Sequence, residues 1–134
     1  MRDFAKLVVY ARQELGTGDE YEHYRPVPDT VRRISELLPN AHVEIVAASW
    51  CKDCRREIPR FAKIAEKLGG WTIDLLGDDP ATRERLSIRR IPTFIIRNPE
   101  TGQELDRIVE SPSGERLEDD LLAIAEQHPG QILA

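Results

Sequence analysis

Trp50-Cys51-Lys52-Asp53-Cys54 contains both cysteines of this 134-residue chain. No third cysteine exists to form a structural bridge with either of them. Two thiols separated by two residues can close a small disulfide ring when the pair stands at the start of a helix. The stretch therefore predicts a switch between a dithiol and a disulfide.

The residues on either side of the pair predict a strand before it and a helix after it. Residues 43–48 form a short apolar run, as expected of a central strand that is covered on both faces. Downstream, apolar residues recur at helical spacing as far as Gly69-Gly70, which ends the helix because glycine tolerates positive φ angles. The apolar positions are Ile58, Phe61, Ala62, Ala65 and Leu68.

The composition describes an ordinary globular protein, with 40% hydrophobic and 32% charged residues. A net charge of −5 argues against a nucleic-acid partner. No apolar stretch approaches the roughly 20 residues that a membrane span needs, and the charged amino terminus lacks a secretory apolar region. We therefore expect a cytoplasmic protein with no membrane or nucleic-acid partner. In a reducing compartment a close cysteine pair is more often catalytic or metal-binding than structural.

The sequence before the strand predicts two helices joined by a polar connector. Residues 3–15 carry an apolar stripe at the 3.6-residue period and predict an amphipathic helix. Residues 19–28 fit either a short edge strand or a loop packed by Tyr21 and Tyr24. Asp29 is the expected N-cap of a second helix, which Pro39-Asn40 ends.

The sequence after the cysteine helix predicts the rest of a mixed sheet. Residues 71–76, 93–97 and 103–109 are expected strands, with turn-forming residues between the last two. Pro80 opens a short helix, and Ser111 or Ser113 is the expected cap of a final helix. The elements together predict an α/β fold with a central mixed β-sheet flanked by helices on both faces.

Several separated features give the chain a resemblance to the thioredoxin family over about residues 29–128. The Trp-Cys-x-x-Cys stretch follows a buried strand, and Pro59 lies five residues after the second cysteine, where the family kinks its active-site helix. Ile91-Pro92-Thr93 resembles the family's cis-proline loop, and Pro80 lies at the expected distance before it. A lone Cys-x-x-Cys is weak evidence, but the combination is specific.

The resemblance implies a thioredoxin-like fold with an extra N-terminal helix. Residues 29–134 would form the thioredoxin-like domain, and residues 1–28 an N-terminal helical extension and connector. That extension would either cover one face of the sheet or offer a surface to a partner.

The sequence departs from the family pattern beneath the cysteines. The family usually buries an Asp below the pair and a Lys on the neighbouring strand, whereas this chain has Ile45 and Ile73 at those positions. Losing both charges together is physically sensible, because losing one would leave the other unpaired and buried. Glu44 and Asp74 are adjacent in sequence, but strand alternation points them to the opposite face.

Within the resemblance, Cys51 is the nucleophile and Cys54 the resolving thiol. Cys51 is expected at the helix N-terminus, where unpaired N–H groups and the macrodipole favour a thiolate. Cys54, one turn further on and more buried, would attack the mixed disulfide and release the reduced substrate. Because the family's buried carboxylate is absent, a water or a nearby acid, Asp53 or Glu57, would have to accept the Cys54 proton.

The expected substrate-binding residues surround the cysteines. A cis Pro92 would bring the backbone of Ile91 against the pair and expose its N–H and C=O to an extended substrate segment. Trp50 would shield the site and contact the substrate. Lys52 and Asp53 lie between the cysteines, and Arg90 replaces a small residue where the family docks substrates, which predicts different substrate preferences.

The leading hypothesis is a thiol–disulfide oxidoreductase that reduces disulfide-containing proteins and is itself re-reduced by a reductase or a small thiol. It would need no cofactor. A zinc site is not expected, because structural zinc takes four ligands and the three histidines, His23, His42 and His128, lack ligand spacing. The alternative function is a binding or adaptor module of the same fold without significant turnover.

Overall fold

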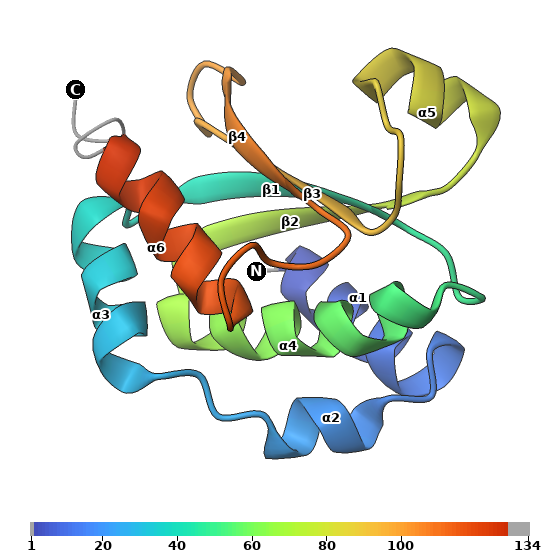
Figure 1. Ribbon diagram of the computed structural model, residues 1–134, viewed down its shortest axis with the longest axis horizontal. Helices are drawn as coiled ribbons and strands as arrows, with labels where there is room; N and C mark the ends of the chain where they lie inside the picture. The colour runs from blue at the N-terminus through green and yellow to red at the C-terminus, as the bar shows by residue number, and fades with distance from the viewer. Residues whose placement is uncertain (1, 129–134) are drawn as a thin grey trace.

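Four strands form one mixed sheet in the order β2-β1-β3-β4 in the computed structural model, which describes residues 2–128 (Figure 1). Strand β1 is parallel to β2 and antiparallel to β3, and β3 is antiparallel to β4. The bounds are Ala41–Ala47 for β1, Trp71–Gly77 for β2, Thr93–Arg97 for β3 and Glu104–Val109 for β4. The sheet confirms the predicted α/β fold.

The helices cover the sheet unequally. In Figure 1, α1, α3, α4 and α6 gather on one side of the sheet, and α5 lies apart from them. Their bounds are Arg2–Val9 for α1, Gly18–His23 for α2, Pro28–Leu37 for α3, Lys52–Leu68 for α4, Pro80–Leu86 for α5 and Leu117–Gln127 for α6. A π-helical segment, η1 (Tyr10–Glu14), follows α1 directly.

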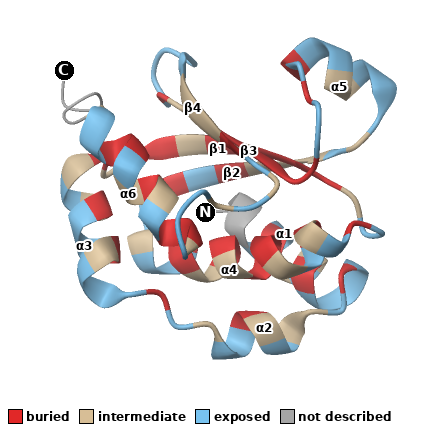
Figure 2. Ribbon diagram, viewed as in Figure 1, coloured by how far each residue is buried: buried red, intermediate tan, exposed pale blue. Residues whose placement is uncertain are grey.

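The hydrophobic core lies between the sheet and α4. Figure 2 shows buried residues gathered in β1, in β3 and along α4. The rings of Phe61 on α4 and Phe94 on β3 stand with centroids 5.1 Å apart and are fully buried. Trp71 is also fully buried, and its indole Nε1 donates a 2.9 Å hydrogen bond to the Leu38 carbonyl. Burial of each such side chain contributes about 1.5–3 kcal/mol to folding.

The first half of β1 is not covered on both faces, contrary to the prediction from its apolar run. His42 and Glu44 are partly exposed, on the face away from α4. Glu44 pairs with Arg97 at 2.7 Å, and His42 contacts Asp74 at 3.1 Å. Contacts between polar and charged side chains cover this part of the sheet in place of a helix.

The N-terminal segment is helical and packs on the core. The predicted helix over residues 3–15 is present as α1 and η1, and the apolar positions Leu7, Ala11 and Leu15 are buried. The connector contains neither the edge strand nor the plain loop that we predicted, because residues 18–23 form α2. Acidic residues in its first turn, Asp19 and Glu20, favour a helix start there. The division of the chain at residue 28 stays a prediction.

The N-termini of two helices differ from the predicted ones. Asp29 does not cap α3, because Pro28 occupies the first helical position and its fixed φ suits that place. The serines do not cap α6, which follows Arg116. The Asp120 carboxylate instead accepts hydrogen bonds from the backbone N–H groups of Ser113 and Gly114, at 2.7 and 2.9 Å, and so shapes the preceding loop.

Glu118 joins the N-terminal connector to α6. Its fully buried carboxylate accepts hydrogen bonds from the Tyr24 hydroxyl at 2.5 Å, the Arg116 Nε at 2.8 Å and the Val27 backbone N–H at 2.9 Å. Burial alone would raise the pKa of Glu118, but these hydrogen bonds outweigh it and lower the pKa below its ordinary value. The buried carboxylate is therefore ionised and satisfied at neutral pH.

We predict that Glu118→Gln lowers the free energy of unfolding by about 1.5–3 kcal/mol at pH 7, because hydrogen bonds to a charged group are lost. A carboxylate with a lowered folded-state pKa stabilises the fold above the unfolded-state pKa, about 4.3, and loses that effect as the pH falls through the folded-state pKa. The difference between variant and wild type should therefore shrink from pH 7 to pH 3. Urea unfolding at both pH values measures it, and an unchanged difference would contradict the assignment.

Candidate active site

Cys51 is the N-cap residue of α4, at the end of the short loop that leaves β1. Its Sγ accepts a 3.2 Å hydrogen bond from the Cys54 backbone N–H, and both thiols are free. Cys51 is 7% exposed, whereas Cys54 is fully buried beneath it. The two sulfurs are thus arranged with one accessible to an attacking partner and the other protected.

The Ile91–Pro92 loop closes over the first cysteine. The Ile91–Pro92 peptide bond is cis, and the Cys51 thiol donates to the Ile91 carbonyl with a sulfur–oxygen distance of 3.6 Å. The loop is held from both sides. The Pro92 carbonyl accepts from the Glu110 N–H at 2.7 Å, and the Thr93 hydroxyl donates to the Arg90 carbonyl at 2.6 Å.

Cys54 is held as a neutral thiol. Burial raises the pKa of Cys54 far above its ordinary value, and the hydrogen bond with Cys51 and the negative charge of that neighbour raise it further. A thiol is a poor nucleophile compared with its thiolate. Before Cys54 can attack a disulfide, another group must accept its proton.

Glu57 is a buried acid on the same helix. The Glu57 carboxylate is fully buried, and its Oε2 accepts a 2.5 Å hydrogen bond from Arg56 Nε. Its Oε1 is buried with no hydrogen-bond partner among residues 2–128. Residues three apart on a helix are neighbours, so this carboxylate and Cys54 share one buried face of α4. A buried carboxylate oxygen without a hydrogen bond destabilises the fold. A chemical role for Glu57 would explain why the protein has such an oxygen.

The two strand positions that we compared with the family's ion pair are apolar, although they are not direct partners, since Ile45 lies opposite Leu75 and Ile73 opposite Val43. Ile45 and Ile73 are fully buried, and no charge replaces either. Glu44 and Asp74 lie on the opposite face, paired with Arg97 and His42, as alternation predicted. Of the two acids that we considered as substitutes, Asp53 is partly exposed and paired with Arg56, whereas Glu57 is buried.

Tyr10 interacts electrostatically with the cysteine pair, which no motif in the amino-acid sequence indicated. Burial raises the pKa of Tyr10 to about 12, and its electrostatic interactions with Cys54, Glu14 and Cys51 raise that pKa in the same direction. Tyr10 is the first residue of η1, and single π-helical turns are frequent at functional sites. From the sequence alone, Tyr10 is predicted only to be part of an amphipathic helix, 41 residues before Cys51.

The predicted substrate-binding residues differ in accessibility. Trp50 is 70% exposed, and Lys52 and Arg90 are also exposed, so these side chains can reach a bound partner. Ile91 and Pro92 have buried side chains. Their backbone faces the cysteine site, where the Ile91 carbonyl contacts the Cys51 sulfur. Asp53 is held in an ion pair with Arg56 at 3.1 Å.

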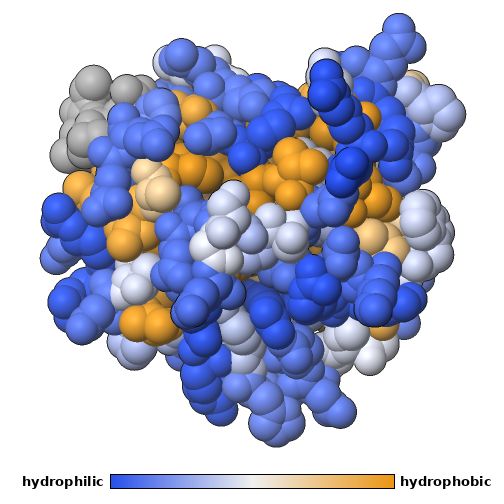
Figure 3. All heavy atoms as spheres, viewed as in Figure 1, coloured by the Kyte–Doolittle hydropathy of each residue, from blue (hydrophilic) through white to orange (hydrophobic). Residues whose placement is uncertain are grey.

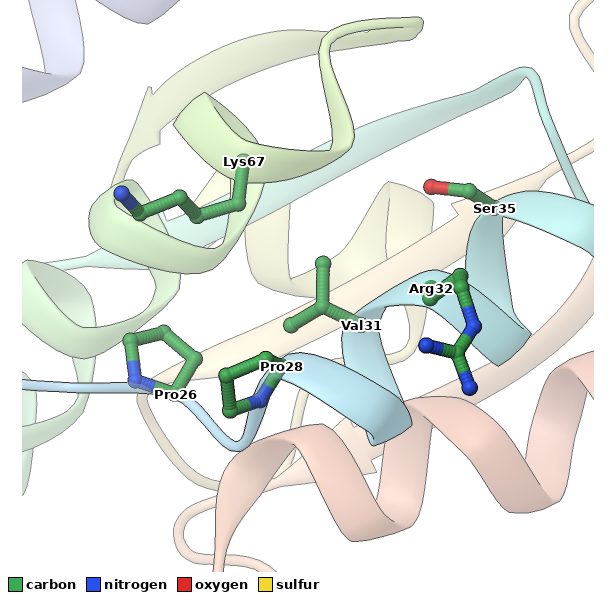
Figure 4. Close-up of a pocket in the computed structure, with 6 residues that line it drawn as sticks. All are labelled: Pro26, Pro28, Val31, Arg32, Ser35 and Lys67. Carbon is green, nitrogen blue, oxygen red and sulfur yellow. The ribbon is translucent and has the colours of Figure 1, made fainter.

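A surface hollow of about 380 Å³ lies away from the cysteines (Figure 4). It is lined by Pro26, Pro28, Val31, Arg32, Ser35 and Lys67. Lys67 and Cys51 stand at opposite ends of α4, about 24 Å apart at 1.5 Å per residue. The hollow is therefore separate from the thiol site.

Two classes of feature are absent from the described residues. Residues 2–128 contain no group of three or more His, Cys, Asp or Glu side chains placed to hold a metal ion. None of the helices in this part of the chain combines the length and the apolar character that a membrane crossing requires.

The fold and the cysteine site are those of a thioredoxin-like protein. A family model described as Thioredoxin matches residues 17–119, which is more than half of the chain. The protein belongs to the thioredoxin family. The comparison with curated proteins found no significant match.

Three solved structures with low sequence identity align with this chain, and the two with a TM-score of 0.63 share its fold. A protein of unknown function from Pseudomonas aeruginosa aligns with a TM-score of 0.63 and 19% identity, over 95% of this chain and 86% of that one. An HIV epitope-scaffold gives a TM-score of 0.63 and 19% identity, over 95% and 87%. A thioredoxin from Malassezia sympodialis gives a TM-score of 0.45 and 23% identity, over 79% and 97%.

We predict that limiting iodoacetamide at pH 7 alkylates Cys51 at least about tenfold faster than Cys54 in the reduced protein. Cys54 is buried and its pKa is raised, and each unit of increase lowers the thiolate fraction about tenfold. Peptide mapping by mass spectrometry measures both rates. The urea-unfolded protein is the control, in which the two rates should converge. Faster alkylation of Cys54 in the folded protein would contradict this geometry.

Proposed function

We propose that the protein is a thiol–disulfide oxidoreductase that reduces protein disulfides through Cys51 and Cys54. The observation that carries this proposal is the position of Cys51. Its sulfur stands at the N-terminus of α4, against the Ile91 carbonyl and directly above a buried second thiol. A substrate segment that enters beside the loop at residue 92 would reach this sulfur first.

The proposed cycle transfers two electrons from the dithiol to the substrate. The Cys51 thiolate attacks one sulfur of the substrate disulfide, which forms a mixed disulfide and releases one substrate thiolate. Cys54 then loses its proton and attacks the Cys51 sulfur, which closes the Cys51–Cys54 disulfide and releases the second substrate thiolate. Each released thiolate takes up a proton. A reductase or a small thiol then supplies two electrons and two protons to restore the dithiol.

In this cycle Glu57 accepts the proton that Cys54 loses. It is a buried acid on the buried face of α4, one turn from Cys54, and its Oε1 is free of hydrogen bonds in the described structure. The Arg56 guanidinium bonded to Oε2 keeps that oxygen occupied and leaves Oε1 as the acceptor. Asp53 is less suited, because its side chain is 34% exposed, whereas that of Glu57 is 2% exposed.

The proposed direction is reduction in the cytoplasm. Both cysteines of the chain lie in the active-site stretch, so the sequence contains no separate structural disulfide of the kind common in oxidising compartments. The reduction potential of the Cys51–Cys54 couple sets the direction of electron flow. No step of the cycle needs a bound cofactor.

We predict that Cys51→Ser reduces insulin disulfide reduction to the background rate, because the accessible nucleophile is lost and the remaining thiol, Cys54, is fully buried. Cys54→Ser should still form a mixed disulfide but release it slowly, so a covalent adduct should accumulate. Turbidity of insulin in dithiothreitol measures turnover, and non-reducing gels detect the adduct. A wild-type protein that stays inactive with every reductant would favour the adaptor function instead.

We further predict that Glu57→Gln slows the resolving step by about 10²-fold at pH 7, the lower end of what one positioned base contributes. The first step, attack by Cys51, should change little. The defect should diminish at higher pH, where solvent hydroxide deprotonates Cys54. Stopped-flow single turnovers with a chromogenic mixed disulfide separate the two steps.

Asp53→Asn is the matched control for Glu57→Gln, since it removes a carboxylate from the same turn of α4 and should slow resolution far less. Equal effects of the two substitutions, or equal slowing of both steps by Glu57→Gln, would remove the proposed role.

A further inference from the structure

We propose that the surface around Cys51 selects disulfides flanked by acidic residues. We name this surface the cationic rim, and it consists of the cations Lys52, Arg55 and Arg89 with the apolar side chains Trp50 and Val109. The inference deepens the proposed function and rests on it, because it names the class of substrate that the thiol site takes.

The first two cations are placed by the start of α4. Lys52 directly follows Cys51, is the first residue of the helix and is exposed. The Arg55 backbone N–H bonds to the Cys51 carbonyl at 3.1 Å. Its guanidinium Nη1 turns back and donates to the Ser49 carbonyl at 3.3 Å, beside the cysteine loop. Both positive charges therefore lie within one helical turn of the reactive sulfur.

The third cation is placed by the loop that contacts Cys51. Arg89 precedes Ile91 by two residues and is exposed, and its backbone carbonyl is fixed by Arg83 Nη1 at 3.1 Å. Figure 3 shows hydrophilic side chains gathered over the start of α4 and over the loop between α5 and β3. The positive charges thus approach the cysteine from two separate segments.

These three cations are uncompensated, unlike their neighbours. Arg56 pairs with Asp53 and Glu57, and Arg90 pairs with Glu110. Lys52, Arg55 and Arg89 have no ion pair with a carboxylate among the described side chains, residues 5–128. A local excess of positive charge in a chain of net charge −5 attracts partners that are locally acidic.

The acids of the neighbouring β2–α5 loop do not cancel this charge. Asp78 is bound to Arg83 through two hydrogen bonds, at 2.5 and 3.0 Å. Asp79 caps α5 and accepts from the Thr82 N–H at 2.9 Å. Both carboxylates therefore bind groups of α5.

The apolar members of the rim give the partner a surface to pack on. Trp50 is 70% exposed and Val109 is 42% exposed, which is unusual for large apolar side chains in this fold. Val109 pairs with Thr93, the residue after Pro92, so it stands on the opposite side of the cis-proline loop from the cysteines' helix. An extended segment lying along the loop would place its cysteine at Cys51 and its acidic residues against the cations.

The test uses three synthetic peptides, each with a central cysteine in a mixed disulfide with thionitrobenzoate, flanked by acidic, neutral or basic residues. The second-order rate of thionitrobenzoate release by reduced protein is measured in low and high salt. We expect the acidic peptide to react about tenfold faster than the neutral one at low salt, within the range of electrostatic steering. The rates should converge near 0.5 M salt, where the Debye length falls to about 4–5 Å.

The variant that tests the rim replaces Lys52, Arg55 and Arg89 with Gln. The ratio of the acidic to the neutral rate is the readout, because the ratio cancels any effect of the substitutions on the thiolate itself. We expect the ratio to fall close to one. The matched control replaces Arg32, Arg33 and Lys67, three exposed cations at a distance from Cys51, and should keep the wild-type ratio.

Three results would overturn the inference. They are equal rates for the acidic and neutral peptides with wild-type protein, an unchanged ratio in the rim variant, and an equal loss of preference in the control variant. In each of these the peptides still react, so the proposed function survives. Failure of all three peptides to react would overturn the proposed function and this inference with it.

Discussion

The contact between the Cys51 sulfur and the Ile91 carbonyl is the constraint on which the rest of the site depends. Strand pairing brings it about, because Val46 near the end of β1 lies opposite Thr93 at the start of β3. The chain that leaves β1 toward α4 must therefore pass the chain that enters β3. The same sulfur accepts the Cys54 N–H, so one atom links the start of the helix to the loop. Charge, exposure and access at the site are all arranged around that atom.

The ionisable groups beneath the cysteines are placed on a helix and not on strands. Apolar Ile45 and Ile73 fill the strand positions where the family usually buries an ion pair, and apolar packing there avoids the desolvation of two charges. Glu57 places one buried carboxylate on α4, three residues after Cys54, and Arg56 compensates its charge. The proton would then leave Cys54 along the helix and toward the solvent side of Arg56, not into the sheet.

Much of the fold could be predicted from local sequence, because short-range signals coincide with tertiary packing. The strand over residues 93–97 was predicted with the observed bounds from its apolar run, and the start of α5 was predicted from Pro80. The helix starts near Asp29 and Ser113 were wrong, because Pro28 and the distant Asp120 competed with ordinary capping. The exposure of one face of the first half of β1 could not be predicted from residues 43–48, because it depends on which helices cross the sheet.

The interaction of Tyr10 with the cysteines could not be predicted either, and it links the N-terminal segment to the cysteine site. That segment is fastened to α4 by the Tyr21 hydroxyl on Glu66 at 3.1 Å and by Arg60 on Glu20 at 2.6 Å. Helix α4 is therefore the common support of the N-terminal segment and the cysteines. Because burial raises the pKa of Tyr10 to about 12, its phenol stays protonated at neutral pH and does not accept a proton from the thiols. In the proposed cycle the acid–base step is therefore left to Glu57.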